Sequence, residues 1–178
     1  MGHFATTAGL NPELEKPGLL QPGPDQPGAA RRRPADVFIP GWPAALDLAI
    51  TSPHRLDAPP EAVTTAGAAA EAYERRKRSH LRTAEDCASQ GFQFRPIVGE
   101  PSGGWGPSAM CAFKAIARAH AAVSHQDVGS VLASELQHLS TVVRRANARA
   151  VLSRSALAAG FVHAAVPAAI AIVAAASE

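Results

Sequence analysis

Two aspartates lie in short segments whose alternating pattern predicts β-strands. Residues 36–39 and 45–51 each alternate aliphatic side chains with small or polar ones, a period of two. The pattern predicts a β-hairpin whose aliphatic side chains share one face while Asp36 and Asp47 share the other. If the turn is centred between residues 41 and 42, the two carboxylates lie directly opposite, about 5 Å apart, and repel each other. A divalent cation between them would remove that repulsion.

A lysine stands on the predicted core-facing side of the following segment. Residues 61–90 carry small and apolar side chains three or four positions apart, which predicts one long helix. The predicted stripe contains Val63, Ala66, Ala70, Tyr73, Lys77, Leu81, Ala84 and Ala88. The chain has only three lysines against fourteen arginines, and lysine rarely faces a core without a partner. Lys77 is therefore a candidate functional residue.

Two strand carboxylates and an inward lysine are the groups that metal-dependent phosphodiester cleavage needs. Carboxylate oxygens are suitable ligands for Mg²⁺ or Mn²⁺, and a bound metal lowers the pKa of a coordinated water. An ammonium group offsets negative charge on the scissile phosphate. The sequence thus predicts a nuclease in which Asp36 and Asp47 hold the metal and Asp36, Asp47 and Lys77 are catalytic.

At these residues the chain resembles a known family. The elements R-P-A-D, D-L-A-I-T-S-P and E-x-x-K, carried by Arg33 to Asp36, Asp47 to Pro53 and Glu74 to Lys77, resemble those of the restriction-like endonuclease domain of non-LTR retrotransposon reverse-transcriptase proteins. The likeness extends to GLNPELEKPGLL, GEPSGGWGPSA and RRANARAVLSRS and covers residues 8–155. The chain would correspond to a C-terminal fragment of such a protein.

The resemblance implies a fold, an activity and roles for residues. The fold would be an α/β (α+β) PD-(D/E)XK core in the order αβββαβ, with additional C-terminal helices. The activity would be the nicking of target DNA so that reverse transcription is primed there. One departure is Ala49, which stands where the wider superfamily has a lysine two residues after the second acid. Lys77 would have to supply that charge from the helix.

Further acidic and basic residues are candidates for the same site. Glu15, Glu74 and Glu100 are possible additional metal ligands, although each has a bland alternative as a surface or loop carboxylate, and Glu74 could instead pair with Lys77 or Arg78. Two arginine clusters are candidates for contacting nucleic acid: Arg31, Arg32 and Arg33, and Arg75, Arg76 and Arg78. The first cluster would hold DNA or simply be a solvated strand entry, and the second would lie on the solvated side of the helix.

Composition and the positions of proline and glycine divide the chain into three parts. With 178 residues and 47% hydrophobic content, the chain can bury one core of ordinary size. Residues 1–30 are rich in proline and glycine and predict a loop with at most a turn of helix at residues 12–15. The endonuclease domain would span residues 31–155, with a further strand at 92–98 after a stop at Gly91. Helices are expected at residues 107–123 and 127–154, and residues 156–178 form an alanine-rich apolar tail.

The tail does not predict a membrane span, because alanine is barely apolar and Pro167 interrupts it. No signal peptide is recognisable, so an intracellular, nuclear location is expected. DNA is the expected partner, with RNA or a reverse-transcriptase domain absent from this chain as further options. With two cysteines the chain has no Cys₂HisCys knuckle.

Two alternatives to an active nuclease stay open. The first is a catalytically inactive retroelement remnant that acts at most as a nucleic-acid-binding module, an alternative favoured by the missing reverse-transcriptase segments. The second is an alanine-rich helical interaction protein, which would contain no strands.

Overall fold

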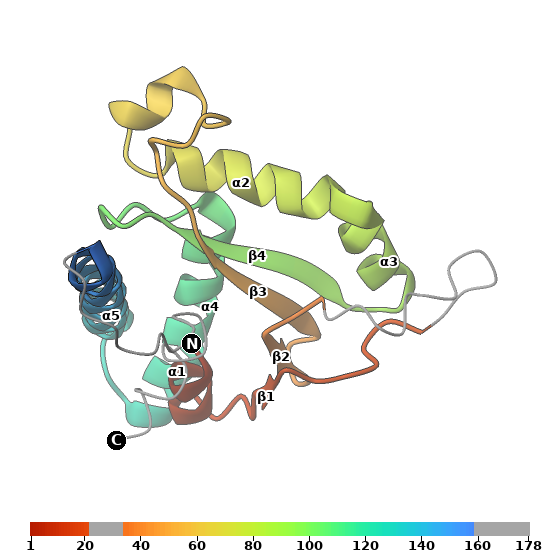
Figure 1. Ribbon diagram of the computed structural model, residues 1–178. Coiled ribbons are helices and arrows are strands. Elements are labelled where there is room, and N and C mark those ends of the chain that lie inside the picture. The colour runs from red at the N-terminus through yellow and green to blue at the C-terminus, as the bar shows by residue number, and fades with distance from the viewer. Residues whose placement is uncertain (22–33, 159–178) are drawn as a thin grey trace.

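The chain folds around a four-stranded sheet with helices on both faces (Figure 1). The computed structural model describes residues 1–21 and 34–158. The strands, in spatial order, are β1 (Glu13–Leu14), β2 (Val37–Ile39), β3 (Ala44–Ile50) and β4 (Gln93–Gly99). The first three are antiparallel neighbours, and β4 runs parallel to β3. The mixed α and β class is confirmed, and the strandless helical alternative is wrong.

The predicted β2–β3 hairpin has the expected register. Val37 pairs with Leu46 and Ile39 with Ala44, so the turn is centred between residues 41 and 42. Val37, Ile39, Ala44 and Leu46 join one buried cluster, against which Leu48 packs, whereas Ile50 at the end of β3 is 45% exposed. Phe38 and Ala45 belong to a second cluster on the opposite face. The period-two pattern therefore predicted both the register and the two faces of this hairpin.

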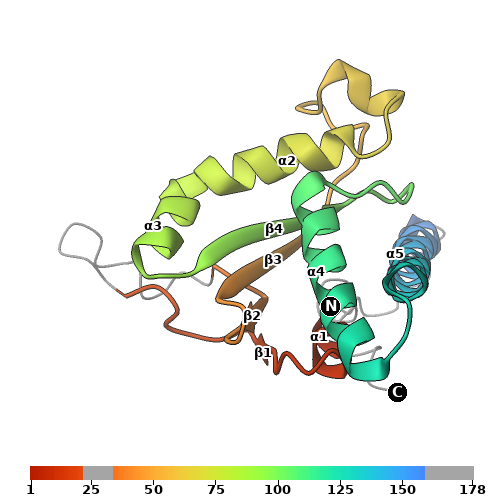
Figure 2. The ribbon, with the colours of Figure 1, turned by 180° about the vertical axis from the view of Figure 1, so that it is seen from behind.

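Helices cover the two faces of the sheet separately (Figures 1 and 2). On one face lie α2 (Ala68–Ser79) and α3 (Thr83–Ser89), which connect β3 to β4. On the other lies α4 (Pro107–Ser124), with α1 (Gly2–Thr7) and α5 (Val128–Ala158) packed beside it. The core between α4 and the sheet contains Val37, Ile39, Leu46, Ile97, Ala109 and Phe113. The core beneath α3 contains Ala45, Cys87, Phe92 and Phe94.

The segment predicted as one helix from residue 61 to residue 90 is broken into four pieces. A 3₁₀ turn η2 (Pro60–Val63) precedes α2, and a second one, η3 (His80–Arg82), separates α2 from α3. Leu81 and Arg82 have φ values of 49° and 55°. Two successive residues in the left-handed region end the helix and turn its direction. Neither Val63 nor Leu81 belongs to a buried stripe, since they are 64% and 61% exposed.

The loop prediction for residues 1–30 is wrong at residues 2–7 and 13–14, while residues 8–12 and 15–21 are loop and turn as expected. Residues 2–7 form α1, and the expected turn of helix at residues 12–15 is instead the edge strand β1, paired with β2. Ala5 and Leu20 are 1% exposed. This segment acquires its structure from hydrogen bonds to β2 and from burial against the sheet, which local composition does not reveal.

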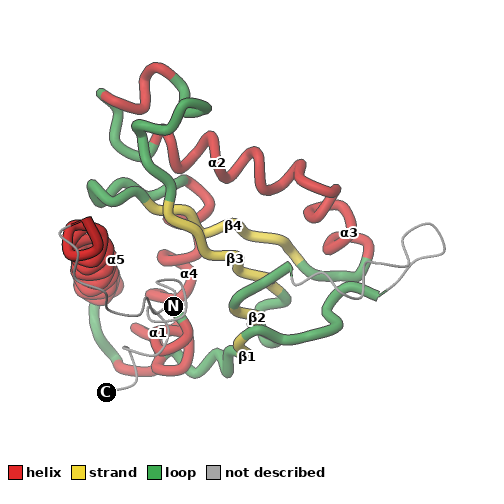
Figure 3. Tube along the Cα trace, viewed as in Figure 1, coloured by secondary structure: helices red, strands yellow, loops and turns green. Residues whose placement is uncertain are grey.

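The remaining predicted elements are confirmed to within a few residues (Figure 3). The strand expected at residues 92–98 is β4, and the helices expected at 107–123 and 127–154 are α4 and α5. Gly91, with a φ of 83°, follows the end of α3 as expected for a left-handed residue that ends a helix. Most of the apolar tail, and all of Arg31, Arg32 and Arg33, lie outside the described residues.

Candidate functional site

Asp36 and Asp47 are brought together by the hairpin. The β2–β3 register, continued by one residue, places Asp36 opposite Asp47. The Asp36 backbone N–H donates to the carbonyl of Leu46 at 2.9 Å, and its carboxylate Oδ2 accepts from the N–H of Leu48 at 2.7 Å. The Asp36 side chain thus takes the place of a backbone acceptor where the β2–β3 ladder ends. This bond holds the carboxylate against β3, beside Asp47.

Lys77 reaches the same point from α2. Its Nζ donates to Asp47 Oδ2 at 2.6 Å, and the two side chains are 22% and 23% exposed. The break after Ser79 leaves Lys77 in the last turn of α2, above β3. The predicted convergence of a lysine on the aspartate pair is therefore present in the fold, with an ion pair formed directly between Lys77 and Asp47.

Burial and neighbouring charges compete at Asp47. Partial burial raises the pKa of the Asp47 carboxyl, because removal from water disfavours its charged form. The hydrogen bond and the charge of Lys77 oppose this rise, while the negative charge of Asp36 adds to it. The net direction is upward, so the hydrogen bond and the charge of Lys77 do not fully offset the burial of the carboxylate and the charge of Asp36.

Glu100 lies at the N-terminus of α2, not beside the aspartates. Its Oε2 accepts from the N–H of Gly67 at 3.0 Å and its Oε1 from the N–H of Ala70 at 3.1 Å. The residue is 2% exposed. It therefore serves as a side-chain cap supplied from the end of β4, which satisfies amide groups that the first turn of a helix leaves without partners.

Glu74 caps the N-terminus of α4 in the same manner. Its carboxylate accepts from the N–H groups of Ser108 at 2.9 Å and Ala109 at 3.0 Å, and it is 1% exposed. Arg78 approaches it at 3.9 Å, close to the pairing weighed from the sequence. Burial raises the pKa of the Glu74 carboxyl, and the two N–H bonds and the charge of Arg78 act against that rise.

Glycines in residues 102–106 allow this pair of caps to form. A Cβ atom on Gly104 would lie 2.5 Å from Glu100 Oε2, and one on Gly106 would overlap the Glu74 carboxylate. The loop therefore passes close to two buried carboxylates, and only glycine fits. Its glycines have a structural explanation that does not involve a ligand.

Glu15 is joined to Asp36 through its backbone. Its N–H donates to the carbonyl of Asp36 at 2.9 Å, and the residue itself is exposed. Across residues 1–21 and 34–158, no three histidine, cysteine, aspartate or glutamate side chains come together as a metal-binding group. Of the acidic residues predicted for the site, the structure brings together Asp36 and Asp47.

Three of the arginines predicted to contact nucleic acid, Arg75, Arg76 and Arg78, lie on the exposed side of α2. Arg75 pairs with Glu71 at 2.8 Å, and Arg76 pairs with Asp57. Arg78 leans toward Glu74. The prediction of a solvated face for these three arginines is confirmed.

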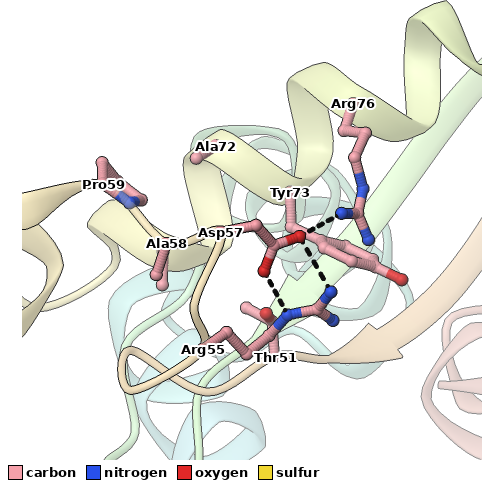
Figure 4. Close-up of a pocket in the computed structure, with 9 residues that line it drawn as sticks. Thr51, Arg55, Asp57, Ala58, Pro59, Ala72, Tyr73 and Arg76 are labelled. Carbon is pink, nitrogen blue, oxygen red and sulfur yellow. Dashed lines mark hydrogen bonds and ion pairs between the residues drawn. The ribbon is translucent and has the colours of Figure 1, made fainter.

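Sequence reasoning missed a small pocket that shares Tyr73 with the surroundings of Lys77. It lies between the loop after β3 and the first half of α2 (Figure 4). Its lining contains Thr51, Arg55, Asp57, Ala58, Pro59, Ala69, Ala72, Tyr73 and Arg76. Arg55 and Arg76 are 21 positions apart in the sequence, and no motif connects them. Only the packing of the loop against α2 brings their side chains to one place.

Comparison of the sequence with models of protein families and with curated proteins, and of the fold with solved structures, finds no match. Among the helices of the described residues, none combines the length and the apolar character needed to cross a membrane.

Proposed function

We propose that this protein is a Mg²⁺- or Mn²⁺-dependent DNA endonuclease that nicks its target by phosphodiester hydrolysis. The observation that carries the proposal is the meeting of Asp36, Asp47 and Lys77 at one point. Two carboxylates lie opposite each other on paired strands, and the Lys77 ammonium is 2.6 Å from one of them. Metal-assisted phosphodiester cleavage uses carboxylates to hold the metal and a cationic group to offset charge on the phosphate.

The order of elements supports a restriction-endonuclease-like core of retrotransposon type. From α1 through β1, β2 and β3, then α2 and α3, to β4, the chain has the αβββαβ order that the family resemblance implies, with two helices in place of one before β4. The two aspartates lie on and beside the second and third strands of that series, and the lysine lies on the helix after them. The additional helices α4 and α5 follow the core, as expected.

The residues present fit a magnesium ion. Mg²⁺ commonly takes one or two protein carboxylates and keeps several waters, so the pair Asp36 and Asp47 is a sufficient donor set. Burial, and to a lesser extent the negative charge of Asp36, raise the pKa of the Asp47 carboxyl, and a cation bound between the two carboxylates would relieve the repulsion between them. When bound, the metal would supply an activated water and a Lewis acid for the phosphate.

The chain's own residues would act around that ion. Asp36 is held against β3 by the N–H of Leu48, so its carboxylate has a defined orientation. Asp47 is oriented by the Lys77 ammonium. Lys77 is 22% exposed and can shift from Asp47 toward a phosphate that enters the site, where its charge would offset the negative charge developing on the phosphate oxygens.

The competing function is an inactive remnant that binds nucleic acid. The observation that favours it is the absence, in residues 1–21 and 34–158, of a third acidic or histidine ligand beside the two aspartates. Such a remnant would bind DNA equally well with and without a metal ion and would not cleave the DNA.

Nicking of supercoiled plasmid separates the two functions. The purified protein would be incubated with Mg²⁺ or Mn²⁺, with and without a chelator, together with Asp47→Asn and Asp127→Asn. Asp127 caps the N-terminus of α5 and is fully exposed, and asparagine caps equally well, so this variant is a matched control. We expect metal-dependent nicking by wild type and by the control and none by Asp47→Asn. Equal nicking by Asp47→Asn would refute the site, and no nicking by folded wild type would favour the remnant.

A further inference from the structure

Three cationic side chains gather around the ring of Tyr73. The guanidinium carbons of Arg55 and Arg76 lie 5.4 and 4.5 Å from the ring centroid, and Lys77 Nζ lies 5.8 Å from it. Figure 4 shows Arg55 and Arg76 approaching Tyr73 from the loop and from α2. The ring therefore joins the pocket directly to the Asp47–Lys77 pair, since Lys77 contacts both.

One carboxylate occupies the space between the two guanidinium groups. Asp57 Oδ1 accepts from Arg55 Nε at 2.8 Å, and its Oδ2 accepts from Arg55 Nη2 at 2.9 Å and from Arg76 Nη1. Arg55 thus holds Asp57 in a two-pronged fork, and Arg76 binds the same carboxylate from the other side (Figure 4). The planar fork of arginine matches a phosphate group as well as it matches a carboxylate.

We propose that Arg55 and Arg76 form a binding subsite for a DNA backbone phosphate, closed in the free protein by Asp57, which occupies the position of the phosphate until DNA displaces it. The identification of DNA as the ligand rests on the proposed nuclease function. The subsite would hold a phosphate next to the one at Asp36 and Asp47 and so fix the path of the strand across β3 and α2.

The exposure of the ion pair makes displacement feasible. The side chains of Arg55, Asp57 and Arg76 are 40%, 48% and 50% exposed, and ion pairs this open to water are weakly held. Asp57 lies in the loop between β3 and η2, outside any helix or strand. The neighbouring arginines lower the pKa of Asp57 to about 2, so it is an anion at neutral pH, as a phosphodiester is.

The position of the subsite fits the cleavage site. Asp47, which pairs with Lys77, lies in the second half of β3 (Ala44–Ile50). Thr51, the residue directly after β3, lines the pocket. α2 packs on β4, and of two of its residues one turn apart, Tyr73 lines the pocket and Lys77 contacts Asp47. Arg76 was predicted from the sequence to contact nucleic acid, and the geometry adds Arg55 and the closing role of Asp57.

The test measures DNA affinity without cleavage. Binding of a fluorescein-labelled 20-base-pair duplex would be followed by anisotropy in a chelator at several salt concentrations, for Asp57→Asn and for Glu85→Gln. Glu85 pairs with Arg82 at 2.6 Å, so its substitution also frees one arginine and changes the net charge equally. In the wild type DNA must first break the exposed ion pairs of Asp57 with the two arginines, whereas Asp57→Asn leaves the subsite open, so binding should tighten about fivefold at 0.1 M salt. We expect this gain in DNA affinity for Asp57→Asn, and for Glu85→Gln a change in affinity within about twofold.

A double variant assigns the gain to the pocket. Asp57→Asn combined with Arg55→Gln should lose the tightening, because the freed fork is gone. Persistence of the gain in the double variant, equal gains for Asp57→Asn and Glu85→Gln, or weaker binding by Asp57→Asn would each overturn the subsite. Loss of plasmid nicking alone would leave this result intact, since the binding assay contains no metal.

Discussion

Replacing Glu74 by alanine would remove the acceptor that caps α4. The carboxylate is 1% exposed and accepts from the N–H groups of Ser108 and Ala109 at 2.9 and 3.0 Å. Both hydrogen bonds are buried, so water cannot easily replace the lost oxygens. The change therefore leaves two amide donors without partners at the end of the helix that covers one face of the sheet.

The size of the effect follows from those two donors. A buried donor left unsatisfied costs about 1–3 kcal/mol, so the pair amounts to about 2–6 kcal/mol. Removing a buried negative charge returns part of this, because burial raises the pKa of the Glu74 carboxyl and the ionised form is therefore costly. We expect the free energy of unfolding to fall by about 3 kcal/mol for Glu74→Ala. Glu74→Gln keeps one acceptor but places an NH₂ group against the other donor, for a loss of about 1–2 kcal/mol.

Urea denaturation at pH 7 followed by circular dichroism would measure these losses. Glu71→Ala is the matched control, since Glu71 lies on the exposed side of α2, where it pairs with Arg75. The control should lose less than about 0.5 kcal/mol. A Glu74→Ala variant as stable as the control would refute the assignment of Glu74 as a cap and would reopen its role as a ligand.

Acid titration supplies a second check on the same residue. The folded pKa of Glu74 is raised above its unfolded value, so the folded state binds the proton first as pH falls. This group therefore makes the protein more stable toward mildly acidic pH and less stable as pH rises through its folded pKa. The Glu74→Gln variant should lack that component of the pH dependence.

Three further outcomes are expected. Gly106→Ala should lower the free energy of unfolding by about 1–3 kcal/mol, because an added methyl would overlap the carboxylate that caps α4, whereas Gly41→Ala, with open space around it, should stay within about 0.5 kcal/mol in the same urea assay. Lys77→Met should raise the pKa of Asp47 further, as followed by NMR titration of the carboxyl carbon, because it removes both interactions that lower it; an unchanged pKa would contradict the ion pair. Asp57 has a folded pKa lowered to about 2, so its contribution to stability is present above about pH 3.8 and disappears as pH falls through about 2; Asp57→Asn should lack this acid-dependent loss in unfolding curves measured between pH 5 and pH 2.

Local sequence patterns were sufficient to predict an element that buries one of its faces and exposes the other. The alternation at residues 36–39 and 45–51 predicted the β2–β3 register, because a shift of one residue would turn every aliphatic side chain to the wrong face. Pro107 and Gly91 marked the start of α4 and the stop after α3, since proline favours a first helical turn and glycine a left-handed end. These signals depend only on neighbouring residues.

Elements that depend on distant partners were missed. β1 forms by pairing with β2, and α1 forms by packing into the core through Ala5. The sequence around both elements contains turn-forming residues. The break between α2 and α3 at Leu81 and Arg82 carries no glycine or proline, so periodicity alone continued the helix through it. Both features are consequences of how segments pack, not of local preference.

In the candidate site, too, the sequence predicted some features and missed others. Residue types and spacing were enough to single out Asp36, Asp47 and Lys77, because period two places the aspartates on one face and lysine is rare on a predicted core-facing stripe. The sequence also raised Glu74 and Glu100 as ligands, and could not show that each carboxylate caps a helix brought to it by the fold. A carboxylate's charge is visible in a sequence, but its partner is not.

The sequence by itself determined the mixed architecture, the hairpin and the aspartates and lysine proposed for the site, since these follow from periodicity and side-chain chemistry. Only the tertiary structure decided which carboxylates meet which amides, that Lys77 reaches Asp47, and that Arg55 and Arg76 share Asp57. Hydrogen bonds and ion pairs act over about 3 Å, and side chains 20 or 30 positions apart come within that distance only when the strands and helices that carry them have packed.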